Sequence, residues 1–424
     1  MNPPSRAPRI VRMVLCTIVV LAVAALAVWA GRQAISTLSP GPSPVPTASA
    51  SLSVVPPTPE PSGTGAADPT PAADPDAQLR AQAETLLANM SLHEKVCQLF
   101  VVYPEAITGV SATVSAGERT RKALEEYPVG GFLYDRKNMV SQEQLRTMLT
   151  AVQSYSKIPL ILTCDEEGGR VNRLMATVGT TWVGPMLDYK DKGTDTAFTN
   201  AKTIATDLVS CGFNTDMAPV ADVWSNPANT VIGDRAYSDD FNQAAQLVAS
   251  AVEGFHAGGV ATALKHFPGH GNTSADSHDG AVYVDRTLEE LRKEELVPFQ
   301  AGIDAGSDLV MVGHLIVSDI DDQPAPFSYA IVTELLREEM GFDGVVITDG
   351  LQMQAMTDTY SSAEIALKAV AAGVDLLLCP SDLESAVDAL TQAVEDGTLT
   401  MDRLDESVLR ILTLKLERGL FSEN

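Results

Sequence analysis

The sequence predicts a TIM-type (β/α)8 barrel, an α/β fold, because eight short apolar runs alternate with longer amphipathic stretches across residues 77–424. The runs have the length and apolar content of buried parallel strands and lie at residues 98–102, 131–134, 160–164, 215–219, 262–266, 309–314, 345–349 and 375–379. The helical patterns lie at residues 118–127, 142–156, 197–211, 242–257, 288–305, 330–340, 363–372 and 383–395. An open doubly wound sheet is the competing architecture, but no GxGxxG motif follows the first run.

The segment that precedes the barrel has two parts. Residues 13–30 contain no charged side chain and three arginines precede them, which predicts a transmembrane helix within residues 1–35 and a cytoplasmic N-terminus. Residues 36–76 hold 11 of the 25 prolines, a composition typical of a disordered linker. We therefore expect a single-pass protein of the cell membrane whose single catalytic domain, residues 77–424, is extracytoplasmic. Secretion after cleavage of a signal peptide is the alternative.

The charge and the cysteines exclude several classes of partner and cofactor. The chain has 29 basic and 55 acidic residues, a net charge of −26, so nucleic acid is not an expected partner. Its five cysteines are scattered and form no CxxC motif, which indicates buried apolar residues rather than disulfides or a zinc site. We expect a monomer without a cofactor or metal ion.

Polar residues follow several of the predicted strands at the point where each strand ends. They are Asp165 after the third run, Asp222 after the fourth, Lys265 and His266 at the fifth, His314 at the sixth and Asp349 at the seventh. Because the carboxyl ends of all barrel strands meet at one face, these side chains are expected to form an active site there.

The segment 265–278 holds three of the six histidines and is interrupted by glycine and proline, which predicts a loop that leaves a strand. Within this segment, Asp276 lies two residues before His278, so its carboxylate can orient the imidazole and stabilise the protonated form. Such a pairing is typical of a histidine that acts as a general acid or base near neutral pH. Asp349 ends the seventh run, where a carboxylate acts either as a nucleophile or as the N-cap of the following helix.

A second polar cluster covers residues 165–173, and Arg235 and Lys265 add two further cations. Fixed donors and acceptors of this kind suit a hydroxyl-rich substrate. A zinc site built from His266, His270 and either His278 or Asp276 is an alternative, but proline and glycine between the first two histidines prevent a regular helix that presents both on one face. A Ser/His/Asp hydrolase is disfavoured because the sequence has no GxSxG motif.

These motifs resemble the bacterial β-N-acetylhexosaminidase branch of glycoside hydrolase family 3. The most specific match is KHFPGHG at residues 265–271 followed by DSH at residues 276–278. Further matching segments occur in family order at residues 90–100, 130–138, 165–173, 218–222, 232–235 and 341–353. The resemblance covers nearly the whole globular part of the chain and implies a TIM-like barrel.

The resemblance also implies roles for individual residues. It implies a retaining mechanism in which Asp349 is the nucleophile and His278 is the general acid and base, with Asp276 as its dyad partner. The sugar-contacting positions of the family correspond to Asp165, Arg173, Arg235, Lys265 and His266.

We therefore expect an exo-β-N-acetylhexosaminidase that releases terminal β-linked N-acetylglucosamine from glycans, in particular from peptidoglycan-derived sugars. A β-glucosidase or a glycoside phosphorylase on the same barrel is the enzymatic alternative. Phosphate could replace water in this reaction, because the neutral imidazole of His278, unlike a carboxylate, adds no negative charge that would repel an incoming phosphate. A surface sugar-binding protein without turnover is the alternative outside enzymes.

Overall fold

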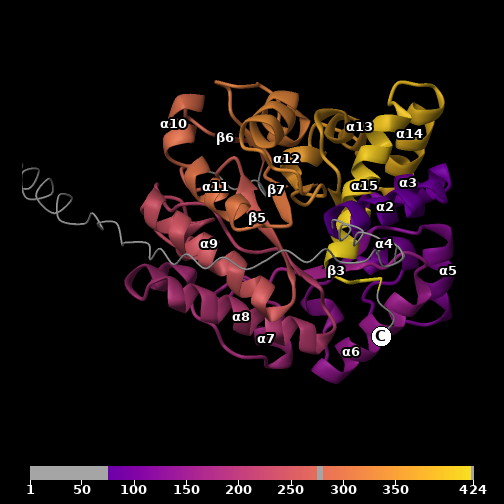
Figure 1. Ribbon diagram of the computed structural model, residues 1–424, viewed down its shortest axis with the longest axis horizontal. Coiled ribbons are helices and arrows are strands. Elements are labelled where there is room, and N and C mark those ends of the chain that lie inside the picture. The colour runs from indigo at the N-terminus through magenta and orange to yellow at the C-terminus, as the bar shows by residue number, and fades with distance from the viewer. Residues whose placement is uncertain (1–74, 275–279, 422–424) are drawn as a thin grey trace, which may run out of the picture. The chain divides into compact units, whose positions relative to one another are not determined.

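Eight parallel strands form the centre of the protein in the computed structural model, which describes residues 75–274 and 280–421 (Figure 1). The strands are β1 (Phe100–Val102), β2 (Gly131–Leu133), β3 (Ile161–Cys164), β4 (Thr215–Asp216), β5 (Ala261–Phe267), β7 (Leu309–Val312), β9 (Val345–Thr348) and β10 (Leu377–Leu378). From β1 to β9 each strand pairs with the next of these strands, and β10 pairs with β1. A parallel bridge between Ile347 and Leu376 brings β9 beside β10. The sheet therefore curls into a barrel, which confirms the predicted fold class.

Helices cover the outside of the barrel and connect its strands (Figure 1). They are α2 (Pro75–Ala88), α3 (Leu92–Gln98), α4 (Pro104–Thr108), α5 (Glu118–Glu126), α6 (Gln142–Tyr155), α7 (Leu174–Val178), α8 (Thr194–Cys211), α9 (Phe241–Gly258), α10 (Leu288–Lys293), α11 (Leu296–Asp304), α12 (Gln354–Thr357), α13 (Ser362–Ala372), α14 (Leu383–Glu395) and α15 (Met401–Glu417). The 3-10 helices are η1 (Arg136–Asn138), η2 (Met186–Asp191), η3 (Gly233–Arg235) and η4 (Ala325–Phe327), and η5 (Ala330–Glu339) is a π-helix. A small separate sheet pairs β6 (Val282–Tyr283) with β8 (Leu315–Ile316).

Every residue of β1, β2, β3, β5, β7 and β9 is buried. Burial on both faces explains why the strands read as continuous apolar runs rather than as alternating polar and apolar residues, since helices cover one face and the barrel interior the other. Polar side chains at the strand ends therefore stand out in the sequence.

Three elements differ from the sequence prediction. The helix expected at residues 288–305 is two helices, α10 and α11, and Glu294 between them leaves the helical conformation. Pro298 explains the break, because its ring would clash with the carbonyl group of Glu294 in a continuous helix. β4 and β10 are shorter than expected. In the run at 215–219, Pro219 has no N–H group to donate to a neighbouring strand.

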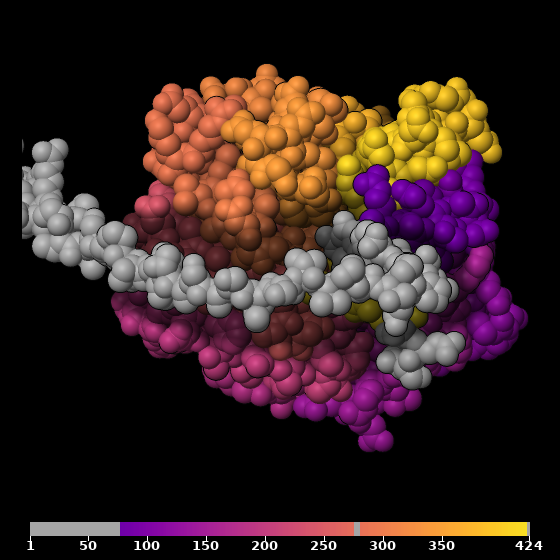
Figure 2. Space-filling view, viewed as in Figure 1, coloured from indigo at the N-terminus to yellow at the C-terminus, as the bar shows by residue number. Residues whose placement is uncertain are grey.

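Helices α2, α3 and α15 were not among the eight predicted helices. Figure 2 shows the last part of the chain, in yellow, lying against the first described part, in indigo, and α15 contacts both α2 and α3. These helices add an outer layer at the place where β1 and β10 meet.

Buried charged groups hold the end of the barrel where the strands begin. Asp375, just before β10, accepts hydrogen bonds from the Val346 N–H at 2.9 Å and from the Ser407 hydroxyl at 2.7 Å, and it pairs with Arg337 and Arg410. These contacts join β9, β10, η5 and α15.

Lys415 of α15 is fully buried at the same end, and its Nζ donates to Oε1 of Gln98 at 2.7 Å. Because burial disfavours the charged form, the pKa of Lys415 falls from 10.5 to about 7.

The predicted transmembrane helix and nearly all of the predicted linker lie outside the described residues; the linker's last two residues begin α2. Among residues 75–274 and 280–421, none of the helices has the length and apolar character needed to cross a membrane. The cysteines in this part of the chain, Cys97, Cys164, Cys211 and Cys379, are all buried and unpaired, as predicted.

Candidate active site

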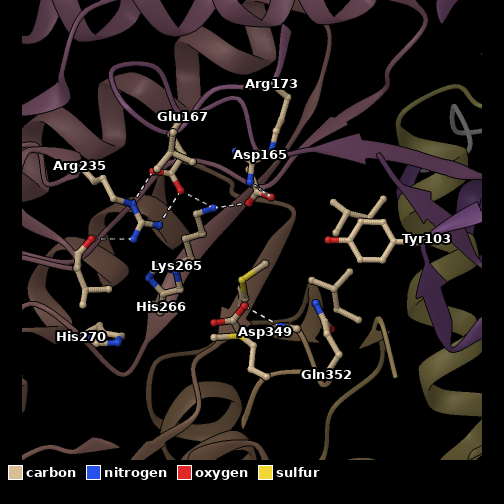
Figure 3. Close-up of a pocket in the computed structure, with 17 residues that line it drawn as sticks. Tyr103, Asp165, Glu167, Arg173, Arg235, Lys265, His266, His270, Asp349 and Gln352 are labelled. Atoms are coloured by element: carbon tan, nitrogen blue, oxygen red, sulfur yellow. Dashed lines mark hydrogen bonds and ion pairs between the residues drawn. The ribbon is translucent and has the colours of Figure 1, made fainter. Parts of the chain in front are cut away.

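A cavity of about 240 Å³ opens at the end of the barrel where the strands finish (Figure 3). Six residues that the sequence assigned to catalysis or sugar binding line it: Asp165, Arg173, Arg235, Lys265, His266 and Asp349. They come from the ends of β3, β5 and β9, from η3 and from the loop before α7. The barrel thus brings together groups that are up to nearly two hundred residues apart in sequence.

Lys265 and Arg235 share one buried carboxylate, Glu167. Arg235 binds it through two nitrogens, Nε to Oε2 and Nη2 to Oε1, each at 2.8 Å, and Lys265 Nζ lies 2.7 Å from Oε1. Although burial alone raises the pKa of Glu167, the two cations hold it far below its usual range. Glu167 is therefore a carboxylate that fixes both cations at the cavity wall.

Asp165 connects this group to Arg173. Its Oδ1 accepts from Lys265 Nζ at 2.8 Å, and its Oδ2 lies 3.4 Å from Nη2 of Arg173. Arg173 also pairs with Asp135 at 2.9 Å. We call Asp165, Glu167, Arg173, Arg235 and Lys265 the ion-pair cluster. Its alternating charges offer donors and acceptors to a ligand along one wall of the cavity (Figure 3).

Asp222 positions the loop that leaves β5. Its Oδ2 lies 2.7 Å from Nδ1 of His266, and its Oδ1 accepts from the N–H of His270 at 2.6 Å. Gly271 packs so closely on the segment that follows β4 that a Cβ atom would lie 1.6 Å from the carbonyl oxygen of Val223. Only glycine permits this approach, so the loop is held against the segment that follows β4.

Asp349 follows β9 directly and is half-buried at the cavity wall. One of its carboxylate oxygens accepts from the N–H of Gly350 at 2.7 Å. Burial alone raises the pKa of this carboxyl, but His266, His314 and Lys265 lower it below its ordinary value overall. Asp349 is therefore ionised at neutral pH, which both a nucleophile and a helix cap require.

The predicted acid–base pair, Asp276 and His278, lies outside the described residues, so its role stays a prediction. The zinc alternative relied on one of these two residues. Within residues 75–274 and 280–421, the structure groups no three His, Cys, Asp or Glu side chains as a metal site.

The sequence interpretation assigned no role to Glu167, Tyr103 or Gln352, which also line the cavity. Glu167 gave a signal, since it belongs to the acidic run that follows β3. Tyr103 and Gln352 gave none, because nothing in the local sequence distinguishes them from surface residues.

Comparison with known proteins identifies the family. The model of the glycosyl hydrolase family 3 N-terminal domain matches residues 91–414. The chain belongs to glycosyl hydrolase family 3. Within this family it is 33% identical over 304 residues to a β-hexosaminidase of Stenotrophomonas maltophilia, an alignment that covers 69% of this chain and 88% of that protein. It is also 33% identical over 322 residues to β-hexosaminidase A of Pseudoalteromonas piscicida, where the alignment covers 69% of this chain and 54% of that longer protein.

Solved structures of similar proteins share the fold. A β-N-acetylglucosaminidase from Paenibacillus sp. superposes with a TM-score of 0.74 at 36% identity, covering 79% of this chain and 64% of that one. LpqI of M. tuberculosis superposes with a TM-score of 0.70 at 32% identity, covering 78% of this chain and 96% of that one.

Proposed function

We propose that this chain is a retaining exo-β-N-acetylglucosaminidase. The observation that carries the proposal is the position of Asp349, whose ionised carboxylate shares one small cavity with the ion-pair cluster. The names of the relatives, β-hexosaminidase and β-N-acetylglucosaminidase, support the choice of sugar. A β-glucosidase on the same barrel is the enzymatic alternative.

In the proposed reaction, Asp349 attacks the anomeric carbon while His278 donates a proton to the departing glycosidic oxygen. A covalent glycosyl–Asp349 ester results, and the imidazole of His278 is left neutral. It then takes a proton from a water molecule, whose oxygen attacks the anomeric carbon and releases Asp349. Two inversions give net retention of configuration. The ion-pair cluster holds the hydroxyl groups of the sugar during both steps.

The size of the cavity supports exo action. At about 240 Å³ it is smaller than the roughly 300–1,000 Å³ of sites for drug-sized ligands, so it suits one sugar ring rather than a stretch of polymer. We propose peptidoglycan-derived glycans as substrates and the outer face of the cell membrane as the location, from the apolar segment and linker in residues 1–76. If washing the membrane fraction without detergent releases all of the protein, this location is contradicted.

Replacing Asp349 by Asn tests the mechanism. We expect kcat/KM on a chromogenic β-N-acetylglucosaminide to fall at least about 10³-fold, since the nucleophile is lost. Asp343→Asn, an exposed aspartate at the other end of β9, is the matched control and is expected to keep full activity. With Asp349→Gly, azide is expected to restore turnover and to give a glycosyl azide of inverted configuration. Wild-type activity in Asp349→Asn would refute the role of this residue.

The same assay separates the remaining alternatives. A higher kcat/KM on the matching β-glucoside would favour the β-glucosidase, and no turnover of either substrate would favour a sugar-binding protein. The product formed in phosphate buffer distinguishes hydrolysis from phosphorolysis, because only phosphorolysis yields a sugar 1-phosphate. His278→Ala is expected to lower activity most on substrates with poor leaving groups, which need the proton most.

A further inference from the structure

His270 lines the cavity (Figure 3) but takes no part in the ion-pair cluster. Its side chain is only 2% exposed, and within the described part of the chain its Nε2 atom has no hydrogen-bond partner. A buried polar atom without a partner costs about 1–3 kcal/mol, so its persistence at a cavity wall needs an explanation.

The opposite nitrogen of the ring, Nδ1, is held by Thr273. The Oγ1 atom of Thr273 lies 2.7 Å from Nδ1 and 2.9 Å from the carbonyl oxygen of His270. A hydroxyl group has one hydrogen, and the carbonyl oxygen has none to share, so the hydroxyl donates to the carbonyl. Oγ1 must then accept a hydrogen from Nδ1. Asn229 reinforces this arrangement, since its Nδ2 donates to the same carbonyl at 2.8 Å and lies 3.3 Å from Oγ1.

This arrangement fixes the tautomer of His270. A neutral imidazole that carries its hydrogen on Nδ1 presents Nε2 as an acceptor. Burial lowers the pKa of His270, with a further contribution from His266, against the opposing effects of Asp222 and Asp349. The ring is therefore neutral at physiological pH, and Asp349 is near enough to act on its pKa.

We propose that Nε2 of His270 accepts a hydrogen bond from an N–H or O–H group of the bound sugar, and that Thr273 is a positioning residue that fixes the tautomer required. This inference rests on the proposed function and adds a specificity-determining contact to it. A neutral acceptor suits this place because it binds a donor group without adding negative charge beside Asp349. The 2-acetamido N–H and the ring hydroxyls are the donors that an N-acetylglucosaminide offers.

Kinetics of His270→Phe, which keeps a flat ring but removes the acceptor, tests the contact. We expect kcat/KM on the β-N-acetylglucosaminide to fall about 10- to 100-fold, the effect of losing one buried hydrogen bond. His270→Gln, which retains an acceptor, is expected to recover part of the loss. Assays of the same variant on the β-glucoside and the 2-deoxy-β-glucoside identify the donor group. If the fall in kcat/KM disappears only with the 2-deoxy substrate, the donor is the group at C2. If kcat/KM falls equally on all three substrates, the donor is another hydroxyl group. No loss on any substrate overturns the proposal.

The tautomer itself is measurable by ¹⁵N NMR of histidine-labelled full-length protein, with His270→Phe or His270→Gln to assign the signal. We expect a hydrogen on Nδ1 and a bare Nε2 in the wild type, and a shift toward hydrogen on Nε2 in Thr273→Val together with a several-fold lower kcat/KM. Thr203→Val, which removes an exposed hydroxyl of α8, is the matched control. A hydrogen on Nε2 in the wild type overturns the inference even if His270→Phe does not fold. Wild-type protein that is inactive on every β-glycoside refutes the proposed function instead.

Discussion

Glu167 has no sugar-binding role assigned from sequence, yet two cations that are proposed to bind the sugar depend on it. Its side chain is 2% exposed and bonded through both oxygens to Arg235, with Lys265 as a third contact. Without this carboxylate, Arg235 would lose its carboxylate partner, Lys265 would keep only Asp165, and the two neighbouring cations would repel. Glu167 therefore keeps both cations together at the cavity wall.

We expect Glu167→Gln to lower kcat/KM about 10- to 100-fold, mainly through a higher KM, because the side chain keeps its shape but no longer neutralises Arg235 and Lys265. Steady-state kinetics on the β-N-acetylglucosaminide measures the effect. Glu143→Gln, an exposed glutamate of α6, is the control and should leave both parameters unchanged. An unchanged KM in Glu167→Gln would show that the cations hold their places without it.

The sequence predicted six of the residues that line the cavity but not how they interact, and two others that it placed at the site, Asp222 and His314, are not among the lining residues. Polar groups at the ends of apolar runs identified Asp165, Lys265, His266 and Asp349, because a polar residue there has no place in the core. Glu167 could not be separated from its neighbour Glu166, which instead accepts hydrogen bonds from the backbone at the start of α7. The proposed tautomer of His270 rests on the hydroxyl of Thr273, which is also bonded by Asn229 from a loop remote in sequence, and no local pattern reveals these contacts.

At the scale of elements, Asp375 joins β10 to three neighbours at the end of the barrel remote from the cavity. We expect Asp375→Asn to lower the free energy of unfolding by about 3 kcal/mol, because removing one partner leaves Arg337 and Arg410 uncompensated in a buried place. Urea unfolding measures the change. The KM of the folded variant should equal that of the wild type, and a raised KM would mean that the two ends of the barrel are coupled.

The pattern of apolar residues predicted the strands and helices correctly wherever burial alone decides which structure forms. All eight strands occur where the apolar runs predicted them, because a strand covered on both faces is apolar over most of its length. The prediction of a single helix at 288–305 was wrong. The 3.6-residue pattern of apolar side chains continues across Pro298, but a regular helical backbone cannot continue there. α15 was missed because counting eight strand–helix pairs left no place for an additional helix.

For the whole molecule, Lys415 predicts how stability depends on pH. The unfolded chain keeps a proton on Lys415 up to about pH 10.5, whereas the folded chain loses it near pH 7. Between these values the unfolded state binds more protons, so the free energy of unfolding should rise with pH, by up to about 1.4 kcal/mol per unit. Below pH 7 both states are protonated and this contribution is constant.

Lys415→Met provides the comparison, because it fills the same space without titrating. Denaturant unfolding of both proteins at several values between pH 6 and pH 9 should give a wild-type curve that rises relative to that of the variant above pH 7. Parallel curves across this range would contradict the low pKa of Lys415.

The pairing that closes the barrel has a consequence for how the protein is made. β1 pairs with β2 early in the chain, but its other neighbour, β10, is synthesised only after all the other barrel strands. A nascent chain on the ribosome therefore holds a sheet with two open edges until β10 has emerged. If the apolar segment within residues 1–35 directs export as proposed, it reaches the translocation machinery while the barrel is still open, when the chain can be threaded through a channel.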